Sequence, residues 1–353
     1  MRQGREIVGC TLAVLAGNGL GDMLTLPPLF YLAMALLLAC ISARWPRWGL
    51  LLGCFVLLGA AAVQVGRMPP ATGPSALIQW AADRKAAFSA WLGEWLPAGD
   101  ELAVLRAISI GDRSSLSRDL RAAYRESGAL HLLALSGLHV GLIYALLVQV
   151  LAPLGGSRSA RILRGGVILC SLWGFAMITG LSVSITRAVL MISFYELSGS
   201  LSGDRDACAA LFGSAFVLMF LRPEATRDIG FQLSYTAVLS ILLLHPWLKS
   251  LLQTRSRLLT RVWELLCVSL CCQFTCGALA WYYFGTFPRY FLVTTLLAIP
   301  LTTAAIYFIP FSLASAALSS HLPFLSSLSQ LSIKVLEWLL HLLNSIILHI
   351  SEL

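Results

Sequence analysis

Three short stretches of the sequence place polar or helix-breaking residues inside apolar runs, where they could do chemistry. The residues are His131, Ser136, Gly137, His139, Arg187, Asp228 and Gln232. Imidazoles can bind metals or transfer protons, and a guanidinium attracts phosphates. A carboxylate can also cap a helix. Because each type also serves structural roles, the elements around these residues decide which chemistry is open to them.

The stretch HLLALSGLHVGL combines two histidines with a helix-breaking pair. His131 and His139 are eight residues apart, which is roughly 12 Å along a helix. Between them, Ser136-Gly137 predicts a break in the helix or a close approach by a neighbouring helix. Two interpretations stay open: satisfied structural histidines, or polar groups that face a cavity.

Two further stretches add charged side chains. Arg187, in TGLSVSITRAVLM, lies about one turn into a predicted membrane span. It must reach the interface, pair with a carboxylate or line an aqueous path. Asp228 and Gln232, in RPEATRDIGFQLS, lie at the start of another span, where Asp228 can act simply as a helix cap.

The composition predicts an all-α, polytopic integral membrane protein. Hydrophobic residues make up 58% of the chain and charged residues 12%, against about a quarter charged in soluble domains. Many continuous apolar runs reach the length of about 20 residues that crosses a bilayer, so we expect about nine to eleven helices, at least one of them broken. The predicted spans are near residues 7–24, 27–42, 49–66, 130–152, 161–180, 183–200, 207–221, 229–246, 262–284, 289–318 and 331–350. The run 289–318 contains Pro300 and Pro310, so it is either one kinked span or two short ones.

The spans divide the chain into residues 1–66, with the N-terminal membrane helices, a connection at 67–127, and a second membrane domain at 128–353. With a cytoplasmic N-terminus, Lys and Arg gather in the inner loops, as the positive-inside rule requires. The connection is then extracytoplasmic. Since topology explains much of the net charge of +8, basicity alone is weak support for a nucleic-acid partner.

The connection contains two predicted amphipathic helices. The first, within 75–97, is either an interfacial helix on the bilayer or a soluble helix packed on the outer face. The second, within 115–128, starts at a serine cap and ends near Gly128. Its arginines, Arg118, Arg121 and Arg125, either attract phosphates at a pore mouth or form an ordinary solvated face.

The predicted orientation gives several polar residues a common depth. The spans that contain His131, Arg187, Asp228 and Gln232 all run from outside to inside, which places these residues in the outer half of the membrane. We therefore expect a polar vestibule open to the exterior, with His139 deeper along the same path.

Metal and nucleotide motifs are absent from the sequence. Its nine cysteines fall mostly in apolar runs without the spacing of a zinc site, and neither H-E-x-x-H nor a P-loop occurs. We expect no metal, no cofactor and no enzymatic activity in this chain.

Together the stretches GDRSSLSRDLRAAYRESGALHLLALSGLHVGL, TGLSVSITRAVLM, RPEATRDIGFQLSYTAVLSILLL and YYFGTFPRYFLVTTLLAIPL resemble the competence domain of ComEC-type bacterial DNA-uptake channels. The resemblance covers about residues 104–310 and implies a channel that passes single-stranded DNA through the bacterial inner membrane during natural transformation. The implied motif positions are Gly111, Asp112, His131, Ser136, Gly137, His139, Arg187, Asp228, Gly230, Phe231 and Gln232, of which Gly111, Asp112, Gly230 and Phe231 are structural. It also implies contact with membrane lipid, an extracytoplasmic DNA receptor and a cytosolic ATP-driven translocase, and leaves a homo-oligomer open.

Some features depart from the family pattern. The connection is too short for the family's OB-like module, and the sequence shows no C-terminal metallo-β-lactamase-like domain. Thr295 stands where the family usually has asparagine. Two other classes stay open: a small-solute secondary transporter and an intramembrane hydrolase that uses the histidines with Asp228.

Overall fold

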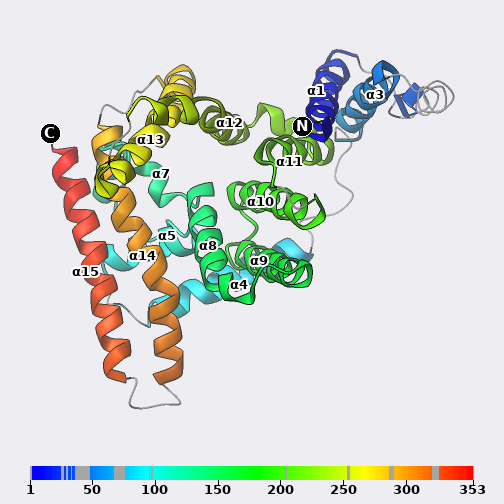
Figure 1. Cartoon of the computed structure of the whole chain (residues 1–353). Helices are drawn as coiled ribbons and strands as arrows, with labels where there is room; N and C mark the ends of the chain where they lie inside the picture. The colour runs from blue at the N-terminus through cyan, green and yellow to red at the C-terminus, as the bar shows by residue number, and fades with distance from the viewer. Residues whose placement is uncertain are drawn as a thin grey trace. The chain divides into compact units, whose positions relative to one another are not determined.

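The computed structural model describes residues 2–24, 28, 31–32, 34–35, 48–66, 76–94, 96, 98–202, 205–252, 255–285, 290–319 and 326–352. Every regular element in these residues is a helix (Figure 1), so the all-α prediction is confirmed. Most of the predicted span 27–42 lies outside the described residues.

The chain forms two compact units. The first combines Met1–Ser75 with Leu190–Leu242. Its complete elements are α1 (Arg2–Met23), α3 (Trp48–Gly66), α11 (Ala207–Leu221) and the short 3-10 helix η2 (Pro223–Arg227). Helix α1 packs against both α3 and α11.

Small residues let α1 approach its neighbours closely. A Cβ on Gly17 would collide with the backbone of Val56, and one on Gly21 would lie 2.8 Å from the carbonyl oxygen of Ala60. The amide of Asn18, buried between these glycines, donates to the carbonyl of Met219 on α11 at 3.3 Å. This is the packing of membrane helices, in which glycines bring backbones together and polar groups bond across the interface.

The second unit combines Ala76–Val189 with Leu243–Leu353. Its elements are α4 (Ala76–Leu92), α5 (Asp100–Ile110), α6 (Arg118–Glu126), α7 (Leu130–Leu133), α8 (Gly137–Val150), η1 (Ala152–Leu154), α9 (Arg158–Ile178), α13 (Arg257–Phe284), α14 (Phe291–Ser319) and α15 (Ser326–Ser351). Helices α10 (Val183–Ser202) and α12 (Ile229–Ser250) run from one unit into the other.

The core of the second unit forms around α5. Nearly every residue from Leu102 to Ile110 is buried, and α5 packs against α4, α7, α14 and α15. Helices α14 and α15, orange and red in Figure 1, lie side by side as an antiparallel pair. Because α5 falls within the predicted connection 67–127, that segment supplies part of the unit's core. The division by topology into 1–66, 67–127 and 128–353 stays a prediction.

Five described helices are long and apolar enough to cross a membrane: α9, α12, α13, the part of α14 up to Ala316, and α15. Three shorter apolar helices occur at Phe55–Gln64, α8 and α11. Exposed aromatic residues on α13, such as Phe274 at 78% exposure, form the apolar outer surface that lipid would cover. The chain is therefore a multi-pass membrane protein, while the count of nine to eleven crossings stays a prediction.

Two predicted spans differ in whether the helix is continuous. The span 130–152 is broken into α7 and α8, because Ala134 and Ser136 adopt extended backbone angles. The predicted break at Ser136-Gly137 is therefore confirmed. From Phe291 onward the run 289–318, by contrast, is one continuous helix, α14, that contains both Pro300 and Pro310.

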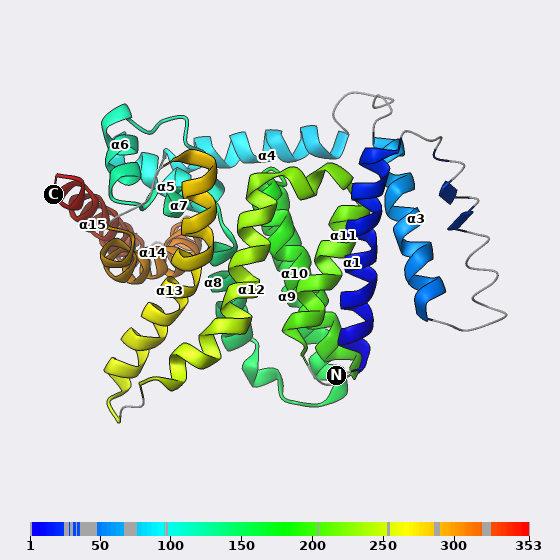
Figure 2. The same ribbon diagram turned by 90° about the horizontal axis from the view of Figure 1, so that it is seen from above.

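Both helices predicted in the connection are present. Helix α4, cyan in Figure 2, packs against α5 and α9, with Ala81 and Leu92 buried and Leu77 and Trp80 exposed near its start. Both predicted positions of this helix, on the bilayer or packed on the outer face, stay predictions.

Helix α6 has the predicted cap and face. Its N-cap, Ser117, accepts a hydrogen bond from the backbone N–H of Leu120 at 3.2 Å. Gly128 follows its C-terminal end with a φ of +77°. Leu120 and Tyr124 are buried.

Candidate functional site

The break before α8 is stabilised by the side chain of His139. The backbone N–H of Ser136 donates to Nδ1 of His139 at 3.4 Å, and the Ser136 hydroxyl lies 3.1 Å from the same nitrogen. This is the geometry of a capping box, with histidine in the place of glutamate or glutamine. Since Nδ1 accepts, the hydrogen of the neutral ring is carried by Nε2.

Gly137 does not lie in tight contact with a neighbouring helix. A Cβ at this position would lie 3.7 Å from the Cβ of Ala188, which is an ordinary van der Waals distance. The glycine is therefore not required by steric contact with the neighbouring helix.

His131 forms a hydrogen bond with the turn that precedes the break. Its Nδ1 donates to the carbonyl of Gly128 at 3.0 Å, and its ring centroid lies 5.4 Å from that of Phe291. The carbonyl of the neighbouring Ser127 accepts from the Thr294 hydroxyl at 2.7 Å. The contacts of His131 with Phe291 and of Ser127 with Thr294 hold the α6–α7 turn against the start of α14. Nδ1 of His131 has a structural partner in the carbonyl of Gly128.

Gly111 and Asp112 build the turn between α5 and α6. Gly111 has a φ of +70°, and a Cβ there would lie 2.8 Å from Leu135, so glycine is required. The carboxylate of Asp112 accepts from the Ser89 hydroxyl at 2.6 Å and from the Ser114 hydroxyl at 2.7 Å. Burial raises the pKa of Asp112, but its hydrogen bonds from Ser89 and Ser114 outweigh burial and hold that pKa below its ordinary value.

Arg187 is buried in the first half of α10, with 6% of its surface exposed. The turn that leads into α10 is strained, since Leu181 has a φ of +50°, which is uncommon for a residue other than glycine. The Thr186 hydroxyl donates to the carbonyl of Ser182 at 3.1 Å, close to the start of α10. A buried guanidinium in an apolar helix is costly and marks a functional position by default.

Asp228 and Gln232 form the start of α12. Oδ1 of Asp228 accepts from the backbone N–H of Phe231 at 2.7 Å, which is an N-cap. Nε2 of Gln232 donates to the carbonyl of Thr226 at 2.9 Å. Gly230 lies within the first turn of α12, between these residues. The cap proposed for Asp228 is therefore present.

Phe231 and its neighbours anchor this helix start. The Phe231 ring is buried and lies 4.2 Å, between centroids, from the ring of Tyr235. The Tyr235 hydroxyl donates to Ser214 on α11 at 3.0 Å. Just before α12, Arg227 pairs with Asp22 of α1 at 2.6 Å. The start of α12 is thereby tied to α11 and α1 within the first unit.

The predicted vestibule residues fall into two groups. His131, Ser136, Gly137, His139 and Arg187 belong to the second unit. Asp228 and Gln232 belong to the first unit. A vestibule that unites the two groups stays a prediction.

The three arginines of α6 are exposed. Arg118, Arg121 and Arg125 lie on the surface, and a guanidinium nitrogen of Arg121 donates to the carbonyl of Arg113 at 3.0 Å. The opposite face of α6 is buried, where the Tyr124 hydroxyl donates to Oδ1 of Asn344 at 2.8 Å. The arginines are thus positioned to meet anions from solution, and the solvated-face interpretation fits the same geometry.

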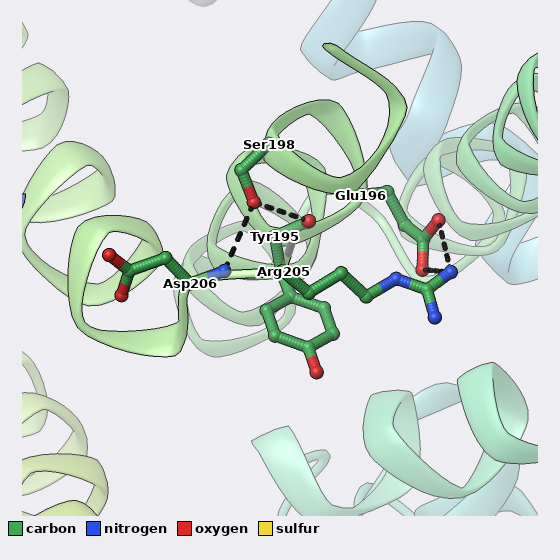
Figure 3. A network of polar contacts seen from close by, with 5 residues as sticks. All are labelled: Tyr195, Glu196, Ser198, Arg205 and Asp206. Atoms are coloured by element: carbon green, nitrogen blue, oxygen red, sulfur yellow. Dashed lines mark hydrogen bonds and ion pairs between the residues drawn. The ribbon is translucent and has the colours of Figure 1, made fainter. Parts of the chain in front are cut away.

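One charged pair was not among the predicted site residues. Glu196 of α10 is only 2% exposed, and Arg205 lies 2.8 Å from its carboxylate (Figure 3). The Arg205 guanidinium also lies 5.7 Å from the centroid of the Tyr195 ring. Beside it, Asp206 caps α11 by accepting from the N–H groups of Cys208 and Ala209. A glutamate inside an apolar run was the signal in the sequence that could have found this pair.

No three His, Cys, Asp or Glu side chains come close enough to hold a metal ion within the residues that the structure describes. The cysteines described there, among them the buried Cys267 and Cys271, form no disulfide with one another. Thr295, which stands at the family's usual asparagine, is buried on α14, and its hydroxyl has no hydrogen-bond partner in the described part of the chain.

The helical fold and the buried polar groups define a polytopic membrane protein with hydrophilic residues inside its bundle. The family model described as competence protein matches residues 108–353. The chain belongs to this family.

Two curated relatives support the assignment. ComE operon protein 3 of Bacillus subtilis (strain 168) is 30% identical over 254 residues, which cover 72% of this chain and 31% of the relative. Competence protein ComA of Neisseria gonorrhoeae is 29% identical over 149 residues, which cover 40% of this chain and 21% of the relative. The chain thus spans a third or less of the length of these relatives. No solved structure matches it.

Proposed function

We propose that this chain is a channel of the bacterial inner membrane that admits one strand of incoming DNA during natural transformation. The observation that carries the proposal is the competence-family match over residues 108–353. That segment contains His131, Arg187, Asp228 and Gln232, the polar residues that an apolar bundle would not hold without a reason.

The proposed attraction for DNA comes from arginines at two levels. The exposed Arg118, Arg121 and Arg125 of α6 would gather phosphates at the mouth, and the buried Arg187 would contact the strand inside the membrane. A pore must bind its cargo weakly enough to release it. A single buried guanidinium meets that requirement better than a cluster, because one charge holds few phosphates at a time.

The remaining polar residues would line the same route. His131, Ser136 and Gly137 lie at the helix break, and Asp228 and Gln232 lie at the start of α12. Irregular backbone inside a membrane is tolerated where protein or water covers it. His139, which caps the break through Nδ1, would lie deeper along this route.

Transport needs further components. We propose an extracytoplasmic receptor that delivers DNA and a cytosolic ATP-driven translocase that pulls it, since the sequence has no P-loop of its own. The proposal places the N-terminus in the cytoplasm, as the distribution of basic residues predicts. A homo-oligomer is compatible with it.

One observation favours a different function, small-solute transport. Discontinuous helices such as α7–α8 form the binding sites of many secondary transporters. Solute counterflow in vesicles containing the purified chain would support this alternative, and its absence together with DNA transport would exclude it.

The decisive experiment is deletion of the gene in its own bacterium, followed by transformation with labelled DNA. We expect the deletion to abolish uptake into the cytoplasm and the wild-type gene to restore it. Arg187→Ala should lower uptake by roughly tenfold or more, since a hydrogen bond to a charged group is lost. Arg187→Lys should fall between, because lysine keeps the charge without the two-pronged contact.

Arg158→Ala is the matched control. Arg158 lies exposed at the start of α9, so the substitution removes the same charge away from the proposed route and should leave uptake near the wild-type level. Normal transformation of the deletion strain would overturn the proposal. Binding of DNA that does not weaken with salt would contradict its electrostatic mechanism, for which a slope of about −0.7 per neutralised phosphate is expected.

A further inference from the structure

The second unit contains an apolar cavity of about 290 Å³ with one notable polar group on its wall. The walls come from α4, α5, α8, α9 and α14, all within this unit. Most lining side chains are aliphatic or aromatic, such as Phe88, Ile143 and Phe175. An engineered apolar cavity of about 150 Å³ stays dry and takes up benzene, so this space is large enough for part of an apolar molecule.

His139 supplies the polar group. The residue is only 1% exposed, and its Nε2 has no hydrogen-bond partner among the described residues. Since Nδ1 accepts from Ser136, the N–H donor of the neutral ring is Nε2, on the other edge of the ring, and His139 is one of the residues that line the cavity. An unsatisfied buried donor costs free energy, and an acceptor supplied by a ligand would recover it.

Neither of the other polar lining groups accepts a hydrogen bond from Nε2 of His139. The Ser109 hydroxyl donates to the carbonyl of Leu105 in its own helix at 2.6 Å. Tyr307 lies half-buried on α14. The ligand must therefore be almost entirely apolar and carry an acceptor where it passes His139.

One residue of the cavity wall is exposed at the surface of the unit, and a lysine side chain lies near the wall. Ile178, a lining residue at the end of α9, is partly exposed. The Lys85 ammonium donates to the carbonyl of Gly111, next to the lining residue Ile110, at 3.3 Å. The aliphatic part of Lys85 also lies 3.3 Å from where a Cβ of Gly180 would be, two residues from Ile178.

We propose that this cavity binds one acyl chain of a membrane phospholipid. The chain fills the apolar space, its ester carbonyl accepts from Nε2–H of His139, and its phosphate lies near Lys85. A phospholipid is the occupant because its groups match three features of the site. Its acyl chain matches the apolar space, its ester carbonyl matches the N–H donor, and its phosphate matches the nearby ammonium group.

The inference is independent of the proposed DNA uptake, because lipid can occupy the cavity whether or not DNA crosses the protein. It does affect His139. A lipid carbonyl at Nε2 keeps this residue from contacting DNA, so the lipid role and the predicted pathway role of His139 are alternatives.

Photolabelling of the full chain tests the proposal. The wild-type protein is reconstituted in vesicles of phosphatidylethanolamine and phosphatidylglycerol that contain a phosphatidylglycerol with a diazirine on its acyl chain. Peptide mass spectrometry then maps the labelled residues. We expect labels at Ile143 on α8 and Tyr307 on α14, which both line the cavity. Labels found only at outward-facing residues such as Phe274 would overturn the proposal.

Variants separate the cavity from the general lipid surface. Ile143→Trp fills the space and should abolish labelling on α14. Val150→Trp, on the same helix but 64% exposed, is the matched control and should leave that labelling unchanged. His139→Leu should lower it roughly threefold to tenfold, because one hydrogen bond is lost.

Competition identifies the ligand. Unlabelled phosphatidylglycerol should displace the label, and an alkane of equal length should do so less well in the wild type but equally well in His139→Leu. Displacement by an isoprenoid quinone and not by phospholipid would overturn the choice of phospholipid. Wild-type mapping stands without the variants, so a variant that fails to fold leaves the proposal testable.

Discussion

The starts of α8 and α12 are both capped by a side chain, but by side chains of different types. Each is the beginning of an apolar helix where backbone N–H groups need acceptors. At α12 the carboxylate of Asp228 accepts from the N–H of Phe231, and Gln232 bonds to the preceding turn. At α8 the ring of His139 reaches back to Ser136 instead.

The difference lies in what remains after the local hydrogen bonds are made. Oδ1 of Asp228 and Nε2 of Gln232 both bond within the turn that begins α12. His139 uses one nitrogen for the helix and leaves the other, buried, without a partner among the described residues. A polar residue at a helix start is thus a stronger candidate for ligand binding when its second functional atom is left over.

The largest effect expected from this contrast is at the packing of α12. Phe231→Ala should destabilise the protein by about 3–5 kcal/mol, because a buried aromatic ring next to Tyr235 is replaced by a cavity. Thermal unfolding in detergent measures the change. Phe220→Ala, at a partly exposed ring of α11, is the control and should cost much less. Equal losses in the two variants would show that Phe231 does not anchor the helix start.

The cap itself should contribute less. Asp228→Ala should cost about 1 kcal/mol, and Asp228→Asn should restore most of it, because asparagine is an equally good N-cap. The same unfolding assay applies. If Asp228→Ala kept full stability yet abolished transformation, Asp228 would belong to the DNA route rather than to the cap.

A smaller effect is expected at the start of α8. Ser136→Ala removes the hydroxyl near Nδ1 of His139 but keeps the backbone N–H contact, so we expect a loss of about 0.5 kcal/mol. Ser171→Ala, at an exposed serine of α9 whose hydroxyl bonds within its own helix, is the control. A loss of several kcal/mol would mean that the hydroxyl, and not the imidazole, holds the break.

The smallest effect concerns pH. The pKa of Asp112 lies below its ordinary value, so its ionised form stabilises the fold at pH above about 4, and this stabilisation is lost as pH falls through the lowered pKa. The melting temperature of wild type should therefore exceed that of Asp112→Asn at neutral pH, and the difference should shrink below about pH 4. A constant difference would show that the charge of Asp112 is unimportant.

Local features could be predicted well from the sequence. The apolar run 207–221 has the bounds of α11, and the break at Ser136-Gly137 and the cap at Asp228 were recognisable from residue type and position. These features depend on neighbours within a few residues, which is why sequence patterns specify them.

Other features depend on distant contacts. Helix α5 packs against α14 and α15, which lie more than 180 residues later in the chain. Because nearly all of its residues from Leu102 to Ile110 are buried, its sequence has no amphipathic period. The ion pair joins Glu196 within α10 to Arg205 beyond the end of α10, a separation in sequence that no helix spacing rule relates. The cavity beside His139 exists because five helices leave space between them, which only packing determines.

The most direct test of the central claim, that DNA crosses the membrane through this chain, is crosslinking to DNA arrested in transit. A photoreactive amino acid is placed at position 131, 187 or 150, and transforming DNA is stalled with a bulky block at its trailing end. We expect DNA adducts at 131 and 187 and none at 150, which lies exposed on the outside of α8. Adducts at none of these positions, while transformation proceeds normally, would contradict the account.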